Sequence, residues 1–271
     1  MALTTSPMTT KVQLRPEPPP PSGDSTDPHE EAPERPEVRT GIYTTRSGAQ
    51  PWLYAGGALL ALLAGYVNAV SLVAVGLTVS HLSGSTSFLG ADLVLPHKEA
   101  EAWPFAVILS CFFFGATASG ALLGSADLRP GRRYGFALIL ESGALFLGTR
   151  WLLGGDALTG AAALAFAMGL QNAMATTYRG LVLRTTHITG IVTDLGVMTG
   201  HLARRERVAG WRFVLLGSLF LGFAGGAVLG TMVFRWLGAQ ALWFPACATL
   251  IAGAGYFLWR AGRAGHLWRE L

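Results

Sequence analysis

The chain has 271 residues, of which 51% are apolar and only 13% are charged. Soluble domains carry roughly 25% charged residues, so this composition excludes an ordinary soluble protein and predicts an integral membrane protein. The formal net charge of +4 does not indicate nucleic-acid binding, because the basic residues gather in the connections between apolar runs.

The first fifty residues are rich in Pro, Ser, Thr and Glu and include four consecutive prolines, Pro18 to Pro21. They contain almost no apolar side chains to bury, so we expect residues 1–50 to form a disordered cytoplasmic tail. A basic start followed by an apolar core is absent from them, which argues against a signal peptide.

Apolar runs long enough to cross a membrane follow the tail. A crossing helix needs roughly 20 residues, at a rise of 1.5 Å each, to span the hydrocarbon core. Tryptophans near the ends of the runs suit the headgroup level. We therefore predict an all-α membrane protein with six transmembrane helices, at about 52–78, 103–126, 134–153, 157–178, 211–236 and 239–260.

Arginines gather in alternate connections between these runs. Six crossings with both termini in the cytoplasm place every arginine-rich segment on one side, as the positive-inside rule requires. This orientation makes residues 263–271 a cytoplasmic C-terminus. The arginines that set it are Arg39, Arg46, Arg129, Arg132, Arg133, Arg179, Arg184, Arg204, Arg205, Arg207, Arg260, Arg263 and Arg269.

The chain contains an internal repeat. His81 and Gly84 match His187 and Gly190 at one offset, 106 residues (187 − 81), and the pairs Ser87/Thr193 and Gly90/Gly196 follow the same offset. Asn68 matches Asn172 at an offset of 104 (172 − 68). The offset of 106 also carries Gly120 and Gly124 onto Gly226 and Gly230, where close helix packing is expected. We interpret residues 51–154 and 155–262 as two related membrane repeats.

Three crossings in each repeat, an odd number, make the two repeats inverted relative to each other. The strings 80–90 and 186–196 are too polar to face lipid and too apolar to be ordinary aqueous loops. We therefore predict an interrupted, re-entrant short helix after the first span of each repeat, shielded by protein or by a water-filled cavity. This architecture recurs in secondary transporters.

Small polar residues open both predicted short helices. Ser and Thr side chains cap free N–H groups, and two helix starts that face each other would present donors and positive dipole ends to an anion or a carboxylate-bearing solute. The alternative is that the caps serve only their own helices. The candidate binding residues here are Ser83, Gly84, Ser85, Thr86, Thr189, Gly190 and Thr193.

Two histidines and three amides extend the candidate site. His81 and His187 are candidates for gating, proton relay or substrate binding, or for hydrogen-bonded struts. Asn68, Gln171 and Asn172 suit either interhelical hydrogen bonding or the lining of a cavity. A metal site needs three or four convergent ligands, and only Asp194 and Asp92 are available as additions, so we predict neither metal nor cofactor.

Two acidic residues lie inside apolar runs, Glu141 and Asp194. Charge in hydrocarbon is costly, so each is a candidate for proton or cation coupling. For Glu141 the alternatives are a partner on a neighbouring helix or a protonated carboxyl without a role. No nucleotide-binding loop, metalloprotease motif or nucleophile elbow is present, so we expect no enzymatic activity.

At the residues of the repeat, the sequence resembles the YoaK family of bacterial integral membrane proteins, a domain of unknown function. The resemblance covers about residues 52–262 and implies a location in the bacterial inner membrane without implying a substrate. Asn68 stands where many members have Asp. If the family couples a cation through the charge at that position, this chain does so differently. The strings that carry the resemblance are 64–69, 79–86 and 184–196.

The repeat favours a secondary transporter of a small polar or anionic solute, with its site between the repeats at the membrane midplane. Its expected partners are the lipid bilayer, the solute and a proton or cation, and we expect no nucleic acid. The sequence leaves the formation of homo-oligomers open. A passive channel of the same fold is the main alternative. A histidine-dependent intramembrane enzyme and a non-transporting scaffold that acts through its tail are weaker ones.

Overall fold

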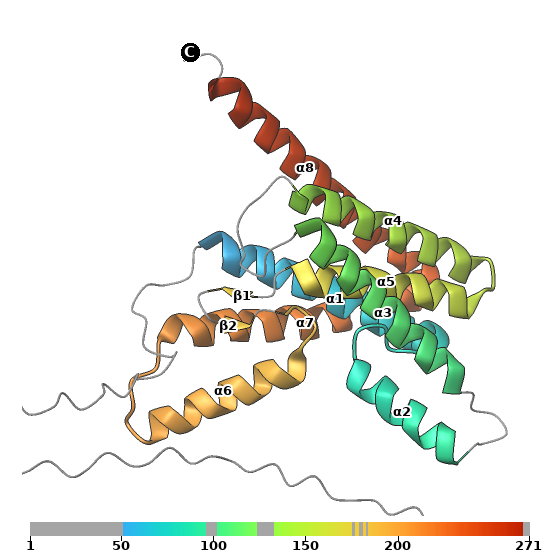
Figure 1. Cartoon of the computed structure of the whole chain (residues 1–271), viewed down its shortest axis with the longest axis horizontal. Coiled ribbons are helices and arrows are strands. Elements are labelled where there is room, and N and C mark those ends of the chain that lie inside the picture. The colour runs from blue at the N-terminus through green and yellow to red at the C-terminus, as the bar shows by residue number, and fades with distance from the viewer. Residues whose placement is uncertain are drawn as a thin grey trace, which may run out of the picture. The chain divides into compact units, whose positions relative to one another are not determined.

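The protein is helical throughout the part that the computed structural model describes, apart from one small hairpin (Figure 1). The structure describes residues 51–95, 102–123, 133–174, 177–178, 181–182 and 184–267. Its elements are α1 (Pro51–Val75), α2 (Leu82–Val94), α3 (Ala102–Leu123), α4 (Arg133–Leu153), α5 (Ala157–Met174), β1 (Thr177–Tyr178), β2 (Leu181–Val182), α6 (Ile188–Ala203), α7 (Gly210–Leu237), the 3-10 helix η1 (Gly238–Leu242) and α8 (Trp243–Leu267). The predicted tail, residues 1–50, lies outside the described residues.

Helices α1 and α5 lie at the centre of the bundle. In α1 every residue from Gly65 to Ser71 is buried, and α5 is buried over most of its second half. The outer helices instead expose large apolar side chains, such as Phe113, Val214, Leu221 and Ile251. A helix that is apolar on its outer face belongs in lipid rather than in water.

Glycines bring α1 and α7 into backbone contact. Side chains added at Gly222 and Gly230 would lie 2.6 Å and 2.8 Å from the carbonyl oxygens of Ala58 and Tyr66. Small residues at four-residue spacing allow such close approach between membrane helices. The later glycine on α7 contacts the later residue on α1, so α1 and α7 run parallel.

The same reciprocal packing joins α3 to α5. A methyl group on Gly169 would overlap with the carbonyl oxygen of Phe112, and one on Gly115 would overlap with that of Phe166. In the other pair, Gly65 faces Phe223 and Gly226 faces Leu62. All four contacts follow one rule. Each glycine faces a residue on the partner helix, and that residue comes three positions before the glycine of the partner helix.

This packing corrects part of the predicted repeat. The structure makes Gly115, not Gly120, the counterpart of Gly226, and a side chain on Gly120 would meet nothing within 4 Å. The offset between α3 and α7 is therefore 111 residues (226 − 115). Close packing is confirmed for Gly226 and Gly230 and is wrong for Gly120, while Gly124 lies outside the described residues.

Helix α4 completes the bundle by packing against α5 and α8. The Oγ of Ser142 donates a hydrogen bond of 2.7 Å to the carbonyl of Ala246 on α8. The hydroxyl of Tyr66 on α1 donates one of 3.0 Å to the carbonyl of Ala241 in η1. These bonds tie α4 to α8 and α1 to η1, and they give two buried hydroxyl groups an acceptor inside the bundle.

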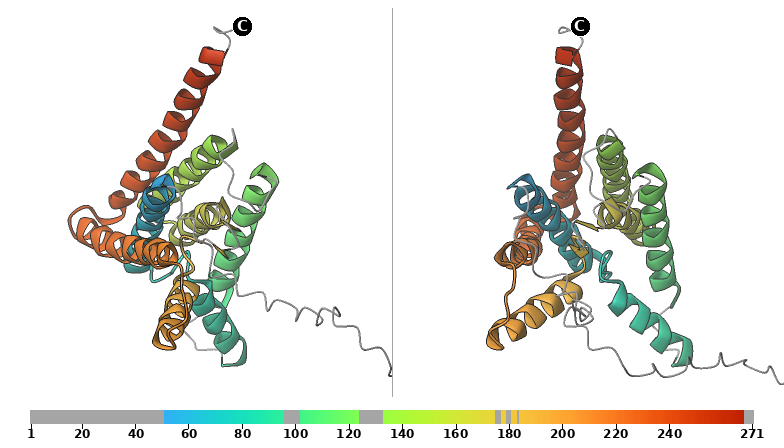
Figure 2. Two further views of the ribbon diagram at one scale, coloured as in Figure 1. Left: turned by 90° about the vertical axis from the view of Figure 1, so that its left-hand side faces the viewer. Right: turned by 60° about the vertical axis from the view of Figure 1, so that its left-hand side comes forward.

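Helices α2 and α6 stand apart from the central bundle. Of the described elements, α2 packs against α3 alone and α6 against α7 alone. All three views show the first turns of both helices directed toward the same central region, while their far ends diverge (Figures 1 and 2). The prediction of a short helix after the first span of each half is therefore confirmed as to position.

Five described helical segments are long and apolar enough to cross a membrane. Four correspond to α1, α3, α4 and α5, and the fifth, 210–259, contains α7, η1 and most of α8. The predicted boundaries of α1, α3, α4 and α7 agree with the helices to within three residues. Helix α5 ends at Met174, four residues before the predicted end, and α8 runs from Trp243 to Leu267, whereas the prediction was about 239–260. The two-residue strands β1 and β2 follow α5 as an antiparallel pair, which the all-α prediction did not include.

Candidate functional site

The two breaks between helices are built around asparagines at equivalent positions. The Oδ1 of Asn68, on α1, accepts hydrogen bonds from the backbone N–H of Ser80 (3.1 Å) and from its hydroxyl (2.9 Å). The Oδ1 of Asn172, on α5, accepts one from the backbone N–H of Thr186 (3.3 Å). Each asparagine thus holds the residue just before the histidine that begins the next helix.

Gln171 ties the second break to the first half of the chain. Its Nε2 donates to the carbonyl of Leu60 on α1 (2.7 Å) and lies 3.2 Å from the hydroxyl of Thr185. Its side-chain oxygen is buried without a partner among the described residues. The interhelical hydrogen bond that the sequence predicted for this amide is present. The Oε1 of Gln171 has no described partner.

His81 occupies the N-cap position of α2 and is half-buried. Its ring lies edge-on to that of Phe223 on α7, with the ring centres 5.2 Å apart. Its Nδ1 is 3.4 Å from the hydroxyl of Ser80, the residue that Asn68 holds. The first histidine is therefore packed between its own break and the helix that pairs with α1.

His187 occupies the N-cap position of α6 and is exposed. Its imidazole lies over the first turn of its own helix, where a side chain on Gly190 would overlap with the ring. At Gly84, the counterpart of Gly190, an added side chain would meet nothing within 4 Å. The two histidines are thus equivalent in sequence position and different in surroundings.

The predicted capping by Ser and Thr side chains is wrong. Neither α2 nor α6 has a side-chain hydrogen bond at its N-cap. The hydroxyls of Thr86 and Thr193 instead donate to the carbonyls of Leu82 and Thr189, one turn back in the same helix. Hydroxyl groups inside an apolar helix commonly satisfy themselves in this way. No side chain therefore caps the first turns, although the N–H of Ile188 on α6 donates to the carbonyl of Thr186 (3.0 Å).

The remaining predicted binding residues fall on the first turns of α2 and α6. Ser85 is 3% exposed, whereas Ser83 and Thr189 are exposed. Leu82 and Ile188, the first residues of the two helices, pack against the same hydrophobic cluster. No hydrogen bond or ring contact joins His81 to His187 within the described residues, so the two starts approach one region without touching.

The two predicted coupling acids lie in different places. Asp194 is half-buried on α6, two turns from His187. Glu141 is fully buried on α4, and α4 packs against neither α2 nor α6. The described residues hold no group of three His, Cys, Asp or Glu side chains suited to a metal ion.

Sequence reasoning missed one buried charge, Arg212 near the start of α7. It is 1% exposed, and its guanidinium carbon lies 5.1 Å from the centre of the Trp211 ring. Arginine over an aromatic face is an attractive arrangement. A basic residue one position inside an apolar run is the signal that marks it in the sequence.

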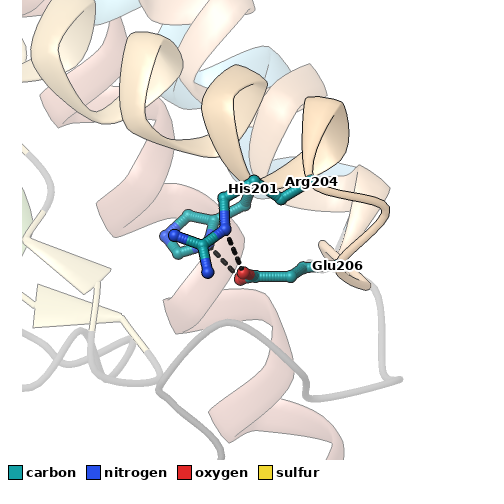
Figure 3. Close-up of polar contacts among 3 residues, drawn as sticks. All are labelled: His201, Arg204 and Glu206. Carbon is teal, nitrogen blue, oxygen red and sulfur yellow. Dashed lines mark hydrogen bonds and ion pairs between the residues drawn. The ribbon is translucent and has the colours of Figure 1, made fainter.

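Polar contacts close the turn after α6. The carboxylate of Glu206 accepts one hydrogen bond from the ring of His201 and pairs with Nε of Arg204 at 3.0 Å (Figure 3). The hydrogen bond from His201, and then the charges of His201 and Arg204, lower the pKa of Glu206 below its usual 4.5. We call these three residues the α6 clasp. It lies in one of the arginine-rich connections between the apolar runs.

The comparison with known families bears on the whole membrane region. A family model described as "Protein of unknown function (DUF1275)" matches residues 56–255. The chain belongs to this family. The DUF1275 match extends from the first turns of α1 into α8 and so includes every element of the candidate site.

A relative from Rhizobium meliloti (strain 1021) supports the same assignment. It is named UPF0700 transmembrane protein RA0705 and is 30% identical over 200 residues, which are 74% of this chain and 84% of the relative. No solved structure matches the chain. This DUF1275 member is therefore a multi-pass integral membrane protein, and the YoaK name stays a prediction from the resemblance.

Proposed function

We propose that this DUF1275 member is a secondary transporter of a small polar or anionic solute in the bacterial inner membrane, with both termini in the cytoplasm. Two inverted repeats would expose one midplane site alternately to either side. In secondary transporters such repeats meet at interrupted helices. The proposal includes no catalytic residue, metal or cofactor.

The proposal requires six crossings, so that α7 and α8 each cross the membrane once on either side of η1. In that arrangement α1 and α7 run outward while α3 and α5 run inward. The parallel contacts of α1 with α7 and the reciprocal packing of α3 with α5 support these directions. They also support the predicted inversion of one repeat relative to the other.

The observation that carries the proposal is the repeated construction of the two breaks. Asn68 holds Ser80 before His81, and Asn172 holds Thr186 before His187. A structural protein has no need of two polar breaks that are built alike and approach one region. A transporter uses them because unwound backbone and helix N-termini bind a polar solute in place of water.

The solute would lie between the first turns of α2 and α6. There the N–H groups that have neither a side-chain cap nor a described backbone partner, such as those of Thr189 and Gly190, offer donors. The positive ends of two helix dipoles also favour an anionic group. Asp194 on α6 is the nearer candidate for cation coupling. The residues that we propose to line the site are Asn68, His81, Ser83, Gly84, Ser85, Thr86, Gln171, Asn172, His187, Thr189, Gly190 and Thr193.

A thermal-shift screen of polar and anionic metabolites on the purified protein tests the site. We expect one class of solute to raise the melting temperature, and we expect His187→Ala to reduce that rise without lowering the melting temperature of the ligand-free protein. His201→Ala is the matched control, since its histidine is on the same helix but at the far end. A solute that stabilises all three proteins equally contradicts the proposed site.

Transport itself is tested with the solute found in that screen. In proteoliposomes we expect accumulation above the external concentration when a proton or cation gradient is applied. Uptake that stops at equal concentrations under every gradient would favour the passive channel instead, because a channel cannot move a solute uphill.

A further inference from the structure

Glu141 combines complete burial with an absence of described partners. The side chain is 0% exposed, and neither Oε1 nor Oε2 has a hydrogen-bond partner among the described residues. Buried hydroxyls on α4 and α8 behave differently: Thr149 donates to the carbonyl of Leu145, and Thr249 donates to that of Pro245. Buried polar groups are normally hydrogen-bonded, so the exception requires an explanation.

The helices around α4 supply no charge to balance a carboxylate. The elements packed against α4 are α3, α5, η1 and α8. The first three contain no Asp, Glu, Lys, Arg or His. On α8 the basic residues begin at Arg260. This position comes after Phe257, which packs against Gly135 at the start of α4, whereas Glu141 lies in the middle of α4.

The other titratable groups on these elements are weak acids or lie at the ends of α4. On α4 itself, the hydroxyl of Tyr134 donates to the carbonyl of Met174, and Arg150 is exposed in the last turn. The groups on the neighbouring helices are Cys111, Cys247 and Tyr256. None of these three groups on the neighbouring helices is a cation near neutral pH.

A carboxylate in such surroundings is strongly disfavoured. Removing an ionised carboxyl from water is costly unless a cation or several donors replace the water. The neutral acid is the form that the described surroundings tolerate, and it places its proton in the middle of an apolar helix. Even the neutral acid leaves an O–H and a C=O unsatisfied here, which an aliphatic side chain would not.

We propose that Glu141 is a proton-binding site, neutral in this conformation and hydrated in another. In the second conformation water reaches the carboxyl, the O–H bond breaks and the proton passes to water, leaving a carboxylate. In a conformation that is open to the opposite side of the membrane, the carboxylate regains a proton from the water there before the bundle closes again. This inference rests on the proposed transport function and makes the proton its coupling ion.

The donor set favours a proton over a metal cation at this position. Hard metal cations, such as Mg²⁺ and Ca²⁺, bind to several oxygen ligands at once. We expect the same of Na⁺. Glu141 belongs to no described group of three potential metal-ligating side chains. A proton needs only one carboxylate oxygen, which Glu141 provides.

Carbodiimide labelling of the purified full-length protein tests the inference without any solute. Carbodiimides add to protonated carboxyls. At about pH 7 an exposed Glu with its ordinary pKa of about 4.3 is protonated in only roughly one molecule in 500. We expect dicyclohexylcarbodiimide, which enters apolar regions, to form an adduct at Glu141, mapped by peptide mass spectrometry, and we expect a water-soluble carbodiimide not to do so.

Three variants and two internal controls make the result decisive. Glu141→Gln should lose the adduct, whereas Asp194→Asn and Glu206→Gln should retain it. The exposed carboxyls of Asp156 and Glu206 should not react with the apolar reagent. If Glu141→Gln does not fold, the adduct map of the unaltered protein still decides. An unlabelled Glu141, or one labelled equally by both reagents, overturns the proposal.

A second measurement separates this inference from the proposed function. In proteoliposomes with a transported solute, Glu141→Gln should abolish accumulation driven by a pH gradient while solute binding persists in the thermal-shift assay. Accumulation that persists in Glu141→Gln overturns the proton-coupling role. If Glu141 is labelled as expected and no solute is accumulated by any gradient, the proton-binding site stands and the transport function fails.

Discussion

Gly65 and Phe223 bring two membrane helices into backbone contact. A methyl group on Gly65 would overlap with the carbonyl oxygen of Phe223, whereas one on Gly56, two turns earlier in α1, would meet nothing within 4 Å. The contact joins α1 of the first half of the chain to α7 of the second. Because the obstructing atom is backbone, it cannot move aside by a change of rotamer.

We predict that Gly65→Ala destabilises the protein by about 1–3 kcal/mol, the usual cost of overpacking a core. Gly169→Ala should do the same, since it occupies the equivalent contact between α3 and α5. Thermal unfolding in detergent measures the effect. Gly56→Ala is the control and should be neutral or slightly stabilising, and equal melting temperatures for the three variants would contradict the packing.

A second prediction concerns the asparagines of the breaks. Asn68→Ala removes the acceptor for both the N–H and the hydroxyl of Ser80. We expect a loss of about 1–3 kcal/mol, because buried donors are left unsatisfied. Asn68→Asp keeps an acceptor in the same place and should be tolerated better, as measured by thermal unfolding. Asn172→Ala, which removes one described bond, should cost less than Asn68→Ala.

The third prediction uses the matched glycines of α2 and α6. Alanine favours a helix over glycine by about 1 kcal/mol, so Gly84→Ala should raise stability slightly where space is free. Gly190→Ala must first displace the ring of His187. We expect the imidazole resonances of His187 to shift in Gly190→Ala. The chemical shifts of His81 should not change in Gly84→Ala. Equal shift changes for the two histidines would contradict the difference in their surroundings.

A fourth prediction is the response of the α6 clasp to acid. The pKa of Glu206 is lower in the folded protein than its usual 4.5, so the clasp stabilises the turn above that pH. Its contribution is lost as the pH falls through the lowered value, when the carboxylate takes up a proton. The protection factors for hydrogen exchange of residues 200–206, which compare each measured rate with the intrinsic rate at the same pH, should fall over this range.

Glu206→Gln supplies the control for the clasp. Its turn should have low protection factors at neutral pH and show no further fall in acid, because no carboxylate remains to be protonated. Slow exchange in this variant at neutral pH would mean that the ion pair does not hold the turn. The site residues on the first turns of α2 and α6 should be unaffected in either case.

The sequence by itself determined the membrane class, the positions of the helices and the two polar breaks. Hydropathy is a local property that sums over about 20 residues, and it needs no knowledge of neighbours. The matched Asn and His residues likewise pointed to the breaks. The prediction that Ser and Thr side chains cap the short helices failed, because these hydroxyls bond to carbonyls one turn back, which residue type alone does not reveal.

Only the tertiary structure decided which residues meet. Glycines are so common in these helices that their spacing allowed Gly120 to be matched with Gly226, whereas the packing selects Gly115. Helices that are apolar on nearly every face carry little periodic signal for their rotation. The difference between His81 and His187, and the isolation of Glu141, follow from that rotation and from the neighbours it brings within reach.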